Sequence, residues 1–214
     1  MEIKLNNVSK TIKSSTVIDS ISISFTSGRI YGLCGYNGCG KTMLMRLITG
    51  LIRPTAGEIY IDGKMLGRDI DFPESVGLLL ENPSFLDRYT GLENLRLIAS
   101  LKGKTDMDAL KLAMRRVNLL PDDKRKYRKY SLGMKQKLGI AAALMELPDL
   151  IILDEPTNAL DAQSLEMLKK IIIEEKQRGA LLIIASHESN FIGEVADEMI
   201  ELENGHIKQK EDGQ

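Results

Sequence analysis

One stretch decides the fold of this 214-residue chain: Gly35-Tyr36-Asn37-Gly38-Cys39-Gly40-Lys41-Thr42. It matches the pattern G-x-x-x-x-G-K-[ST], in which glycines let the backbone wrap closely around a polyphosphate and direct several N–H donors toward it. Lys41 is placed to reach the β- and γ-phosphates, and the Thr42 hydroxyl is placed to ligate Mg²⁺. The alternative is a glycine turn followed by chance by Lys and Thr.

The residues on either side of this stretch favour the first interpretation. Arg29–Cys34 predict a strand leading into the loop, and Lys41–Thr49 predict a helix leading out of it. The N-terminus of that helix would direct the positive end of its dipole at the phosphates. We therefore predict a nucleotide-binding loop.

The rest of the chain predicts an α/β fold with a parallel sheet at its core. Glu2–Val8 and Ser20–Phe25 alternate apolar and polar residues, which is typical of strands with one buried face. Further strands are predicted at Gly57–Gly63, Val76–Leu80, Leu150–Leu153, Ala180–Ala185 and Met199–Leu202, and helices at Leu92–Leu101, Asp106–Leu119, Leu132–Met145 and Ser164–Arg178. Residues 84–147 thus form a helical insertion between two parts of one nucleotide-binding unit, 1–83 and 148–214.

Composition excludes some classes of protein. With 43% hydrophobic and 28% charged residues the chain is an ordinary globular protein, and a net charge of -1 gives no general attraction to nucleic acid. No apolar run approaches the length of a membrane span, and no signal peptide opens the chain. Both cysteines, Cys34 and Cys39, lie at the phosphate loop, where a disulfide would distort it, so we expect a reduced, cytoplasmic setting.

Two further strand ends carry candidate chemistry. The apolar run Leu150–Leu153 leads into Asp154 and Glu155, at the carboxyl end of a parallel strand, where ligands bind in open α/β sheets. Asp154 would hold Mg²⁺ through its water shell, and Glu155 would act as general base toward the attacking water. His187 follows the next predicted strand, so we expect it at the same edge, holding the base and the water in place. Alone, either feature is common and only marks a strand end.

A helix start at Ser131 completes the pattern. Ser131 is a natural N-cap and Gly133 permits close backbone approach, but many helices begin in this way. The significance lies in the order of the pieces along the chain. The loop is followed by Glu81-Asn82-Pro83, the helical insertion, Ser131-Leu132-Gly133-Met134-Lys135-Gln136, Leu150–Pro156, Asn158–Asp161 and Ser186-His187.

In this order the chain resembles the ATP-binding cassette (ABC) ATPase family over nearly its whole length. The resemblance implies a P-loop NTPase fold with an antiparallel N-terminal β part and a helical signature subdomain. It implies in turn that the protein binds and hydrolyses ATP with Mg²⁺ as cofactor. It also implies that Ser131, Gly133 and Gln136 cap ATP held by a second ATPase subunit, identical or not. Ala159, Leu160 and Asp161 resemble the loop that crosses the dimer interface, and His187 the switch histidine.

Within the family, Tyr130–Gln136 looks most like the ATPase subunits of bacterial exporters of bacitracin, lantibiotics and related peptides. The resemblance implies a separate multi-spanning permease and a place at the cytoplasmic face of the membrane. The alternative is a soluble, ATP-switched member of the family that acts on the ribosome or nucleic acid. Such members usually carry two cassettes or a long coiled coil, which this chain lacks. A third reading, a slow nucleotide-sensing regulator, conflicts with the presence of Glu155.

Three departures from the family pattern carry expectations of their own. The signature has Leu132 and Met134 around Gly133. Glu81 stands where the family usually has a glutamine that contacts Mg²⁺ and water, which adds negative charge beside the γ-phosphate. Ile12 falls where an aromatic residue usually stacks on adenine, so adenine would gain only apolar contact.

Two other features have simpler interpretations. The basic residues Lys124, Arg125, Lys126, Arg128 and Lys129 are expected to form a solvated surface; the alternative is a contact with an acidic partner loop or anionic headgroups. If the Cys39 thiol is exposed, its alkylation should block nucleotide binding.

Overall fold

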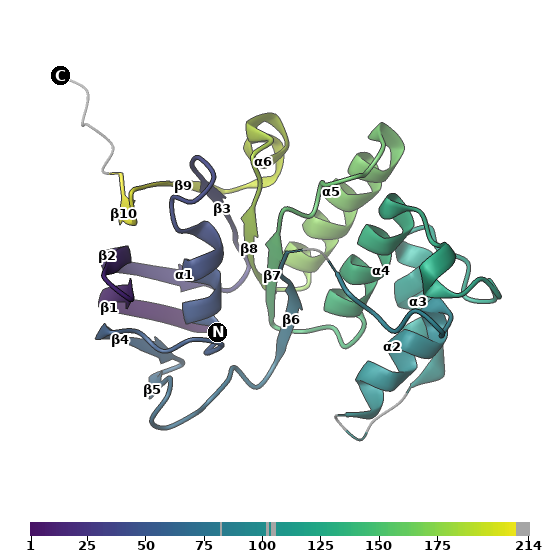
Figure 1. Cartoon of the computed structure of the whole chain (residues 1–214), viewed down its shortest axis with the longest axis horizontal. Coiled ribbons are helices and arrows are strands. Elements are labelled where there is room, and N and C mark those ends of the chain that lie inside the picture. Colours follow the sequence, from purple (N-terminus) through teal and green to yellow (C-terminus); the bar gives the residue numbers. More distant parts are fainter. Residues whose placement is uncertain (82, 102, 104–105, 209–214) are drawn as a thin grey trace.

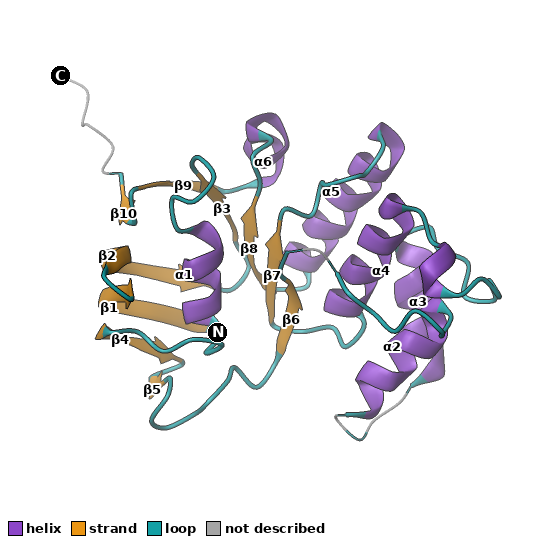
Figure 2. Cartoon of the chain, viewed as in Figure 1, coloured by secondary structure: helices purple, strands orange, loops and turns teal. Residues whose placement is uncertain are grey.

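The computed structural model describes residues 1–81, 83–101, 103 and 106–208 (Figure 1). Asn82 of the Glu81-Asn82-Pro83 segment lies outside the described residues, as do residues 209–214. The strands form two sheets (Figure 2). The first is antiparallel, in the order β2-β1-β4-β5, and consists of β1 (Glu2–Ile12), β2 (Ser15–Thr26), β4 (Ala56–Ile61) and β5 (Lys64–Met65). This is the antiparallel N-terminal part that the resemblance implied.

The second sheet has the order β10-β9-β3-β8-β7-β6. Five of its strands run parallel, and the short β10 is antiparallel to its neighbour. The strands are β3 (Ile30–Cys34), β6 (Val76–Leu79), β7 (Leu150–Asp154), β8 (Leu181–Ala185), β9 (Glu198–Glu203) and β10 (His206–Ile207). Every residue of β7 and β8 is buried, as the continuous apolar runs predicted for central parallel strands.

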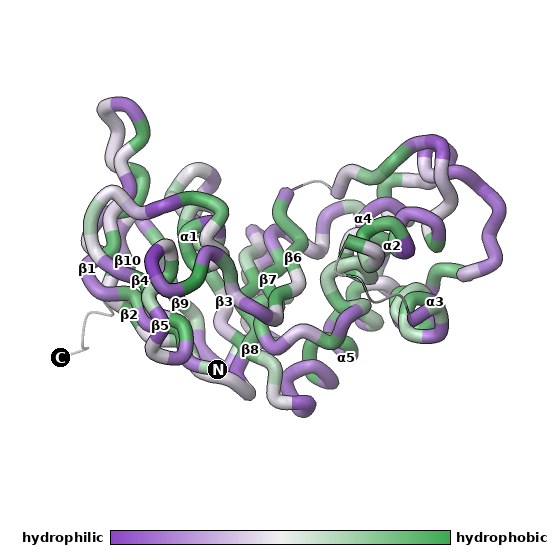
Figure 3. The backbone as a smooth tube through the Cα atoms, turned by 90° about the horizontal axis from the view of Figure 1, so that it is seen from below, coloured by the Kyte–Doolittle hydropathy of each residue, from purple (hydrophilic) through white to green (hydrophobic). Residues whose placement is uncertain are grey.

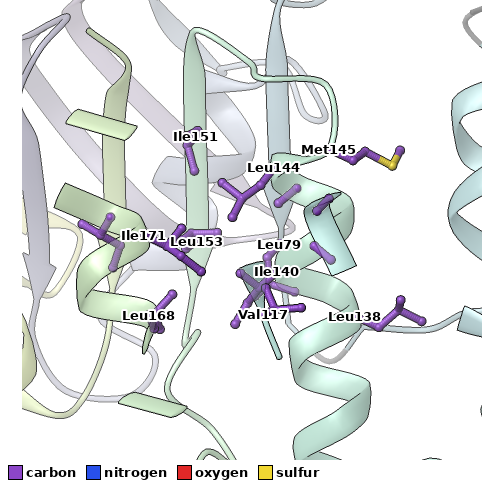
Figure 4. Packing of buried hydrophobic residues seen from close by; sticks show 14 of the residues in the cluster. Leu79, Val117, Leu138, Ile140, Leu144, Met145, Ile151, Leu153, Leu168 and Ile171 are labelled. Atoms are coloured by element: carbon purple, nitrogen blue, oxygen red, sulfur yellow. The ribbon is translucent and has the colours of Figure 1, made fainter. Parts of the chain in front are cut away.

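Helices cover both faces of the parallel sheet. Helix α1 (Lys41–Ile48) lies between it and the antiparallel sheet, and packs with Leu150 and Ile152 of β7 in one hydrophobic core. The opposite face packs α4 (Leu132–Leu144) and α5 (Ala162–Gln177) against Ile151 and Leu153 of the same strand (Figure 4). Alternate residues of one strand therefore supply two separate cores.

The remaining helical elements lie beyond α4 (Figure 3), except for the last, which packs against β3 and α5. They are α2 (Gly91–Ser100), α3 (Met107–Arg116), the 3₁₀ turn Tyr127–Lys129 and α6 (Ser189–Val195). Among the helices of the described residues, none is both long and apolar enough to cross a bilayer. Helix α4 shares its core with β6 and β7, so the division into a core (1–83 and 148–214) and a helical subdomain (84–147) stays a prediction.

Several boundaries differ from those predicted. β1 and β2 are each longer than Glu2–Val8 and Ser20–Phe25, because register shifts between Leu5 and Thr11 break the alternation while the pairing continues. α6, β5, β10 and the 3₁₀ turn were not predicted, since each is too short to show a period. The N-cap at Ser131 is confirmed: its hydroxyl accepts a hydrogen bond from the Met134 N–H at 3.2 Å.

A buried ion network links the inserted helices to the helix after β7. Glu175 of α5 is 2% exposed and accepts hydrogen bonds from Arg116 of α3 at 2.6 Å and from Arg178 at 2.8 Å. The adjacent Glu174 also pairs with Arg116, at 3.1 Å, but is 45% exposed. Removing one partner of a buried pair leaves an uncompensated charge, whereas an exposed pair contributes little.

We predict that Glu175→Ala lowers the free energy of unfolding by about 3 kcal/mol, because both arginines lose a buried partner. The matched control Glu174→Ala should cost about 1 kcal/mol or less, since that carboxylate is largely solvated. Urea denaturation of both variants checks this. Equal costs would contradict the assignment of the buried carboxylate as the centre of the network.

Candidate functional site

The site lies where the carboxyl ends of four neighbouring parallel strands meet. β3, β8, β7 and β6 lie side by side, so the loops that follow them share one edge of the sheet. A pocket of about 640 Å³ opens there. Its lining residues come from the phosphate loop and the other strand ends: Val17, Asn37, Gly38, Gly40, Lys41, Thr42, Met43, Glu81, Asp154, Glu155 and Asn158.

Two glycines of the phosphate loop are required by close approach. At Gly35 (φ +138°) a Cβ would lie 2.3 Å from the Leu202 carbonyl oxygen, and at Gly40 (φ +117°) it would lie 2.9 Å from the Val17 carbonyl oxygen. The buried Lys41 ammonium donates to the Gly35 carbonyl at 2.7 Å, so its charge lies within the curve of the loop. The sequence prediction of a cradle with one central cation agrees with this geometry.

The turn between β9 and β10 braces the loop from behind. The Tyr36 hydroxyl donates to the side chain of Asn204 and accepts from its backbone N–H, and the Gly205 N–H donates to the Cys39 carbonyl at 3.0 Å. Sequence reasoning missed Tyr36, Asn204 and Gly205. The Asn-Gly pair signals a turn, but nothing in the sequence pairs that turn with a loop more than 160 residues away.

Thr42 and Asp154 join the loop to the end of β7. The Thr42 hydroxyl donates a hydrogen bond to the Asp154 carboxylate, which is buried. Burial raises the pKa of Asp154, and the neighbouring carboxylates of Glu155 and Glu81 raise it further, against the Thr42 hydrogen bond and Lys41. A cation would therefore relieve an unfavourable buried charge.

The donor chemistry at this point fits Mg²⁺. A hydroxyl and carboxylates are the hard oxygen ligands that Mg²⁺ prefers. Within the described residues, no group of three or more His, Cys, Asp and Glu side chains is arranged to hold a metal ion. Mg²⁺ usually keeps several waters and shares substrate phosphates, so it does not require an all-protein cage.

Glu155 and His187 are in direct contact, as their strand positions predicted. His187 Nδ1 lies 2.7 Å from Glu155 Oε2, and the His187 backbone N–H donates to the same oxygen at 3.2 Å. Glu155 has a left-handed backbone (φ +49°), which turns the chain sharply at the end of β7. The arrangement fixes one carboxylate oxygen and suits the orientation of a water.

Glu81 also lines the pocket, but it has a partner that the sequence analysis did not foresee. Its carboxylate forms a hydrogen-bonded ion pair with Arg46 of α1. Arg46 lies one helical turn after Thr42, a spacing that places both side chains on one face of α1. The spacing indicates that Arg46 lies on the same face of α1 as Thr42, but it does not identify Glu81, 35 residues away, as the partner of Arg46.

The predicted signature residues face a different part of the chain. Leu132, Gln136 and Ala159 line a second hollow of about 850 Å³, and a Cβ at Gly133 would lie 2.8 Å from the Ala159 carbonyl oxygen. Gln136 is buried and donates to the Glu155 backbone carbonyl at 3.0 Å, while Asp161 caps α5 by accepting from the Ser164 N–H at 2.8 Å. The signature thus contacts the Asn158–Asp161 loop and does not line the phosphate-loop pocket.

One expectation is not met, and another stays a prediction. Cys39 is only 1% exposed, because its side chain packs in the core behind the loop, so the condition for its alkylation fails. Ile12, at the end of β1, is not among the residues that line the pocket, where Val17 of β2 supplies an apolar side chain instead. The basic run is largely exposed, as expected, with Lys126 paired to Glu93 and Arg125 to Asp123.

The sequence of the chain is similar to those of known ABC transporter proteins. The family model described as ABC transporter matches residues 18–158. The chain is 44% identical over 209 residues to the uncharacterized ABC transporter ATP-binding protein YybJ of Bacillus subtilis (strain 168), covering 98% of this chain and 96% of that protein.

Two further relatives are named for the compounds they transport. The bacitracin transport ATP-binding protein BcrA of Enterococcus faecalis is 36% identical and is matched over 96% of this chain and 67% of its own length. The lantibiotic transport ATP-binding protein SrtF of Streptococcus pyogenes is 34% identical, over 91% and 84%.

Solved structures share the fold. An ATP-binding subunit of an ABC transporter superimposes with a TM-score of 0.87 at 27% identity, covering 98% of this chain and 89% of that one. A dimeric ATP-binding cassette bound to ADP and phosphate superimposes with a TM-score of 0.83 at 24% identity, over 97% of each chain. The phosphate loop, the paired acids at the end of β7 and these likenesses lead to one conclusion: the chain belongs to the ABC transporter family, as an ATP-binding, ATP-hydrolysing subunit.

Proposed function

We propose that this subunit hydrolyses ATP to power a separate permease that exports a peptide, an antibiotic or a similar compound. The observation that carries the proposal is the Glu155–His187 contact beside the phosphate loop, because an ATPase needs a fixed acceptor for the proton of the attacking water. The cargo class comes from the bacitracin and lantibiotic transport relatives. These relatives give no support to a role on the ribosome or nucleic acid.

In this proposal each pocket residue has one task. The glycine-rich backbone and Lys41 bind the β- and γ-phosphates. Thr42 and Asp154, with Glu81 nearby, would hold Mg²⁺, which neutralises charge on the phosphates. Glu155 accepts the proton of the attacking water, and His187 keeps its carboxylate oriented. Val17 is the apolar side chain placed to contact the nucleoside, and Ile12 keeps only a predicted role there.

The signature would act in trans. Ser131 and Gly133 are absent from the lining of the chain's own phosphate-loop pocket, and Gly133 lies against Ala159, so the two residues suit ATP bound by a second subunit. Gln136 would act from behind, since its amide holds the backbone of Glu155 in place. Whether the second subunit is a copy of this chain or a sister ATPase is left to experiment.

The permease would dock in an apolar groove at the other side of Glu81. The groove has a volume of about 420 Å³ and is lined by β6, Pro83, Phe85 and the end of α2 with Leu101. Leu101, one of the residues that line the groove, is 85% exposed and adds apolar surface for a partner to cover. A short amphipathic segment of the permease at the cytoplasmic membrane face fits this surface.

We predict that Glu155→Gln retains ATP binding and loses roughly 10²- to 10⁴-fold in turnover, because the amide cannot accept the proton. Phosphate release measures turnover, and equilibrium binding of a fluorescent ATP analogue measures affinity. Asp149→Asn, at the opposite end of β7, is the matched control and should leave both unchanged. Near-normal turnover of Glu155→Gln would remove Glu155 as the base.

The transporter role is tested by purifying tagged Glu155→Gln protein from detergent-solubilised membranes of its native cell with MgATP. We expect a multi-spanning polypeptide in fixed proportion, and we expect Leu101→Asp in the same background to lose it while still binding ATP. Recovery of ribosomes, nucleic acid or soluble partners, with no membrane protein, would reject the transporter role and leave the ATPase site standing.

A further inference from the structure

Arg46 and Glu81 form an ion pair at the rim of the nucleotide pocket. The guanidinium comes from the last turn of α1, and the carboxylate follows β6, in a residue with a left-handed backbone (φ +56°). Both side chains are partly solvated, at 31% and 62% exposed. Exposed pairs of this kind add little to folding stability, so stability alone is a poor reason for this contact.

The charges around the pocket give a better reason. Glu81, Asp154 and Glu155 place three carboxylates in its lining, and Lys41 is the one lysine or arginine among the lining residues. ATP brings several more negative charges to the same place. A carboxylate at position 81 is therefore unfavourable for nucleotide binding unless a cation accompanies it.

We propose that Arg46 is a positioning residue that holds Glu81 as a charge-neutral pair, so that an oxygen ligand stands beside the terminal phosphates without adding net repulsion. The inference rests on the proposed function of the pocket. It makes Arg46 important because of Glu81, and dispensable once position 81 is neutral.

The test is equilibrium binding of a fluorescent ATP analogue to the full chain, with excess EDTA and with Mg²⁺, for the wild type, Arg46→Gln, Glu81→Gln and the double variant. We expect Arg46→Gln to raise the Kd roughly tenfold in EDTA, because one carboxylate loses its counter-charge near a highly charged ligand. The double variant should return to within about twofold of the wild type. The effect should shrink with Mg²⁺ and with added salt.

Lys64→Gln is the matched control, since it breaks the exposed Lys64–Glu74 pair in β5, outside the pocket lining, and should leave the Kd unchanged. Equal weakening by Arg46→Gln with Glu and with Gln at position 81 would overturn the inference, because Arg46 would then act on the nucleotide alone. No weakening in either background would overturn it too. A wild-type chain that binds no MgATP would instead overturn the proposed function itself, so the two failures are distinguishable.

Discussion

The hydrogen bond from Thr42 to Asp154 is the contact on which the arrangement of the site depends. It joins two segments more than 100 residues apart, the start of α1 and the end of β7, and thereby brings the phosphate loop to Asp154 and Glu155. The sheet order makes the contact possible, since β8 alone separates β3 from β7 and the three strands run parallel. Helix α1 and strand β7 also share one hydrophobic core, so packing fixes their distance before any ligand arrives.

From this centre, charge explains much of what surrounds it. Asp154 is buried with two carboxylates near it, and it accepts a hydrogen bond from Thr42. Glu81 pairs with Arg46, Glu155 contacts His187, and Lys41 places a positive charge inside the loop. Each acid of the pocket thus has a hydrogen-bonding partner of its own. Under the proposed function, such a site is prepared for a polyanion that arrives with a cation, and the carboxylate of Glu155 is held in one orientation beforehand.

Much of this could be predicted from the sequence, because the decisive signals are local. The phosphate loop, the apolar run before Asp154 and Glu155, and the N-cap at Ser131 are each read within eight residues or fewer. The tertiary contacts could not be predicted. Arg46 on Glu81 and the Asn204 turn behind Tyr36 join residues 35 and 168 positions apart, and no periodicity reports such contacts. The burial of Cys39 escaped prediction for the same reason, since it depends on neighbours contributed by other elements.

We propose that one chain alone holds an incomplete site, because Ser131 and Gly133 do not line the pocket of their own phosphate loop. The most direct measurement is sedimentation of Glu155→Gln protein with Mg²⁺ and either ATP or ADP. We expect a species of twice the chain mass with ATP and a single chain with ADP. The second subunit in this species is another copy of the chain or a sister subunit supplied in the experiment. A single-chain mass at saturating ATP, with both subunit combinations tested, would contradict it.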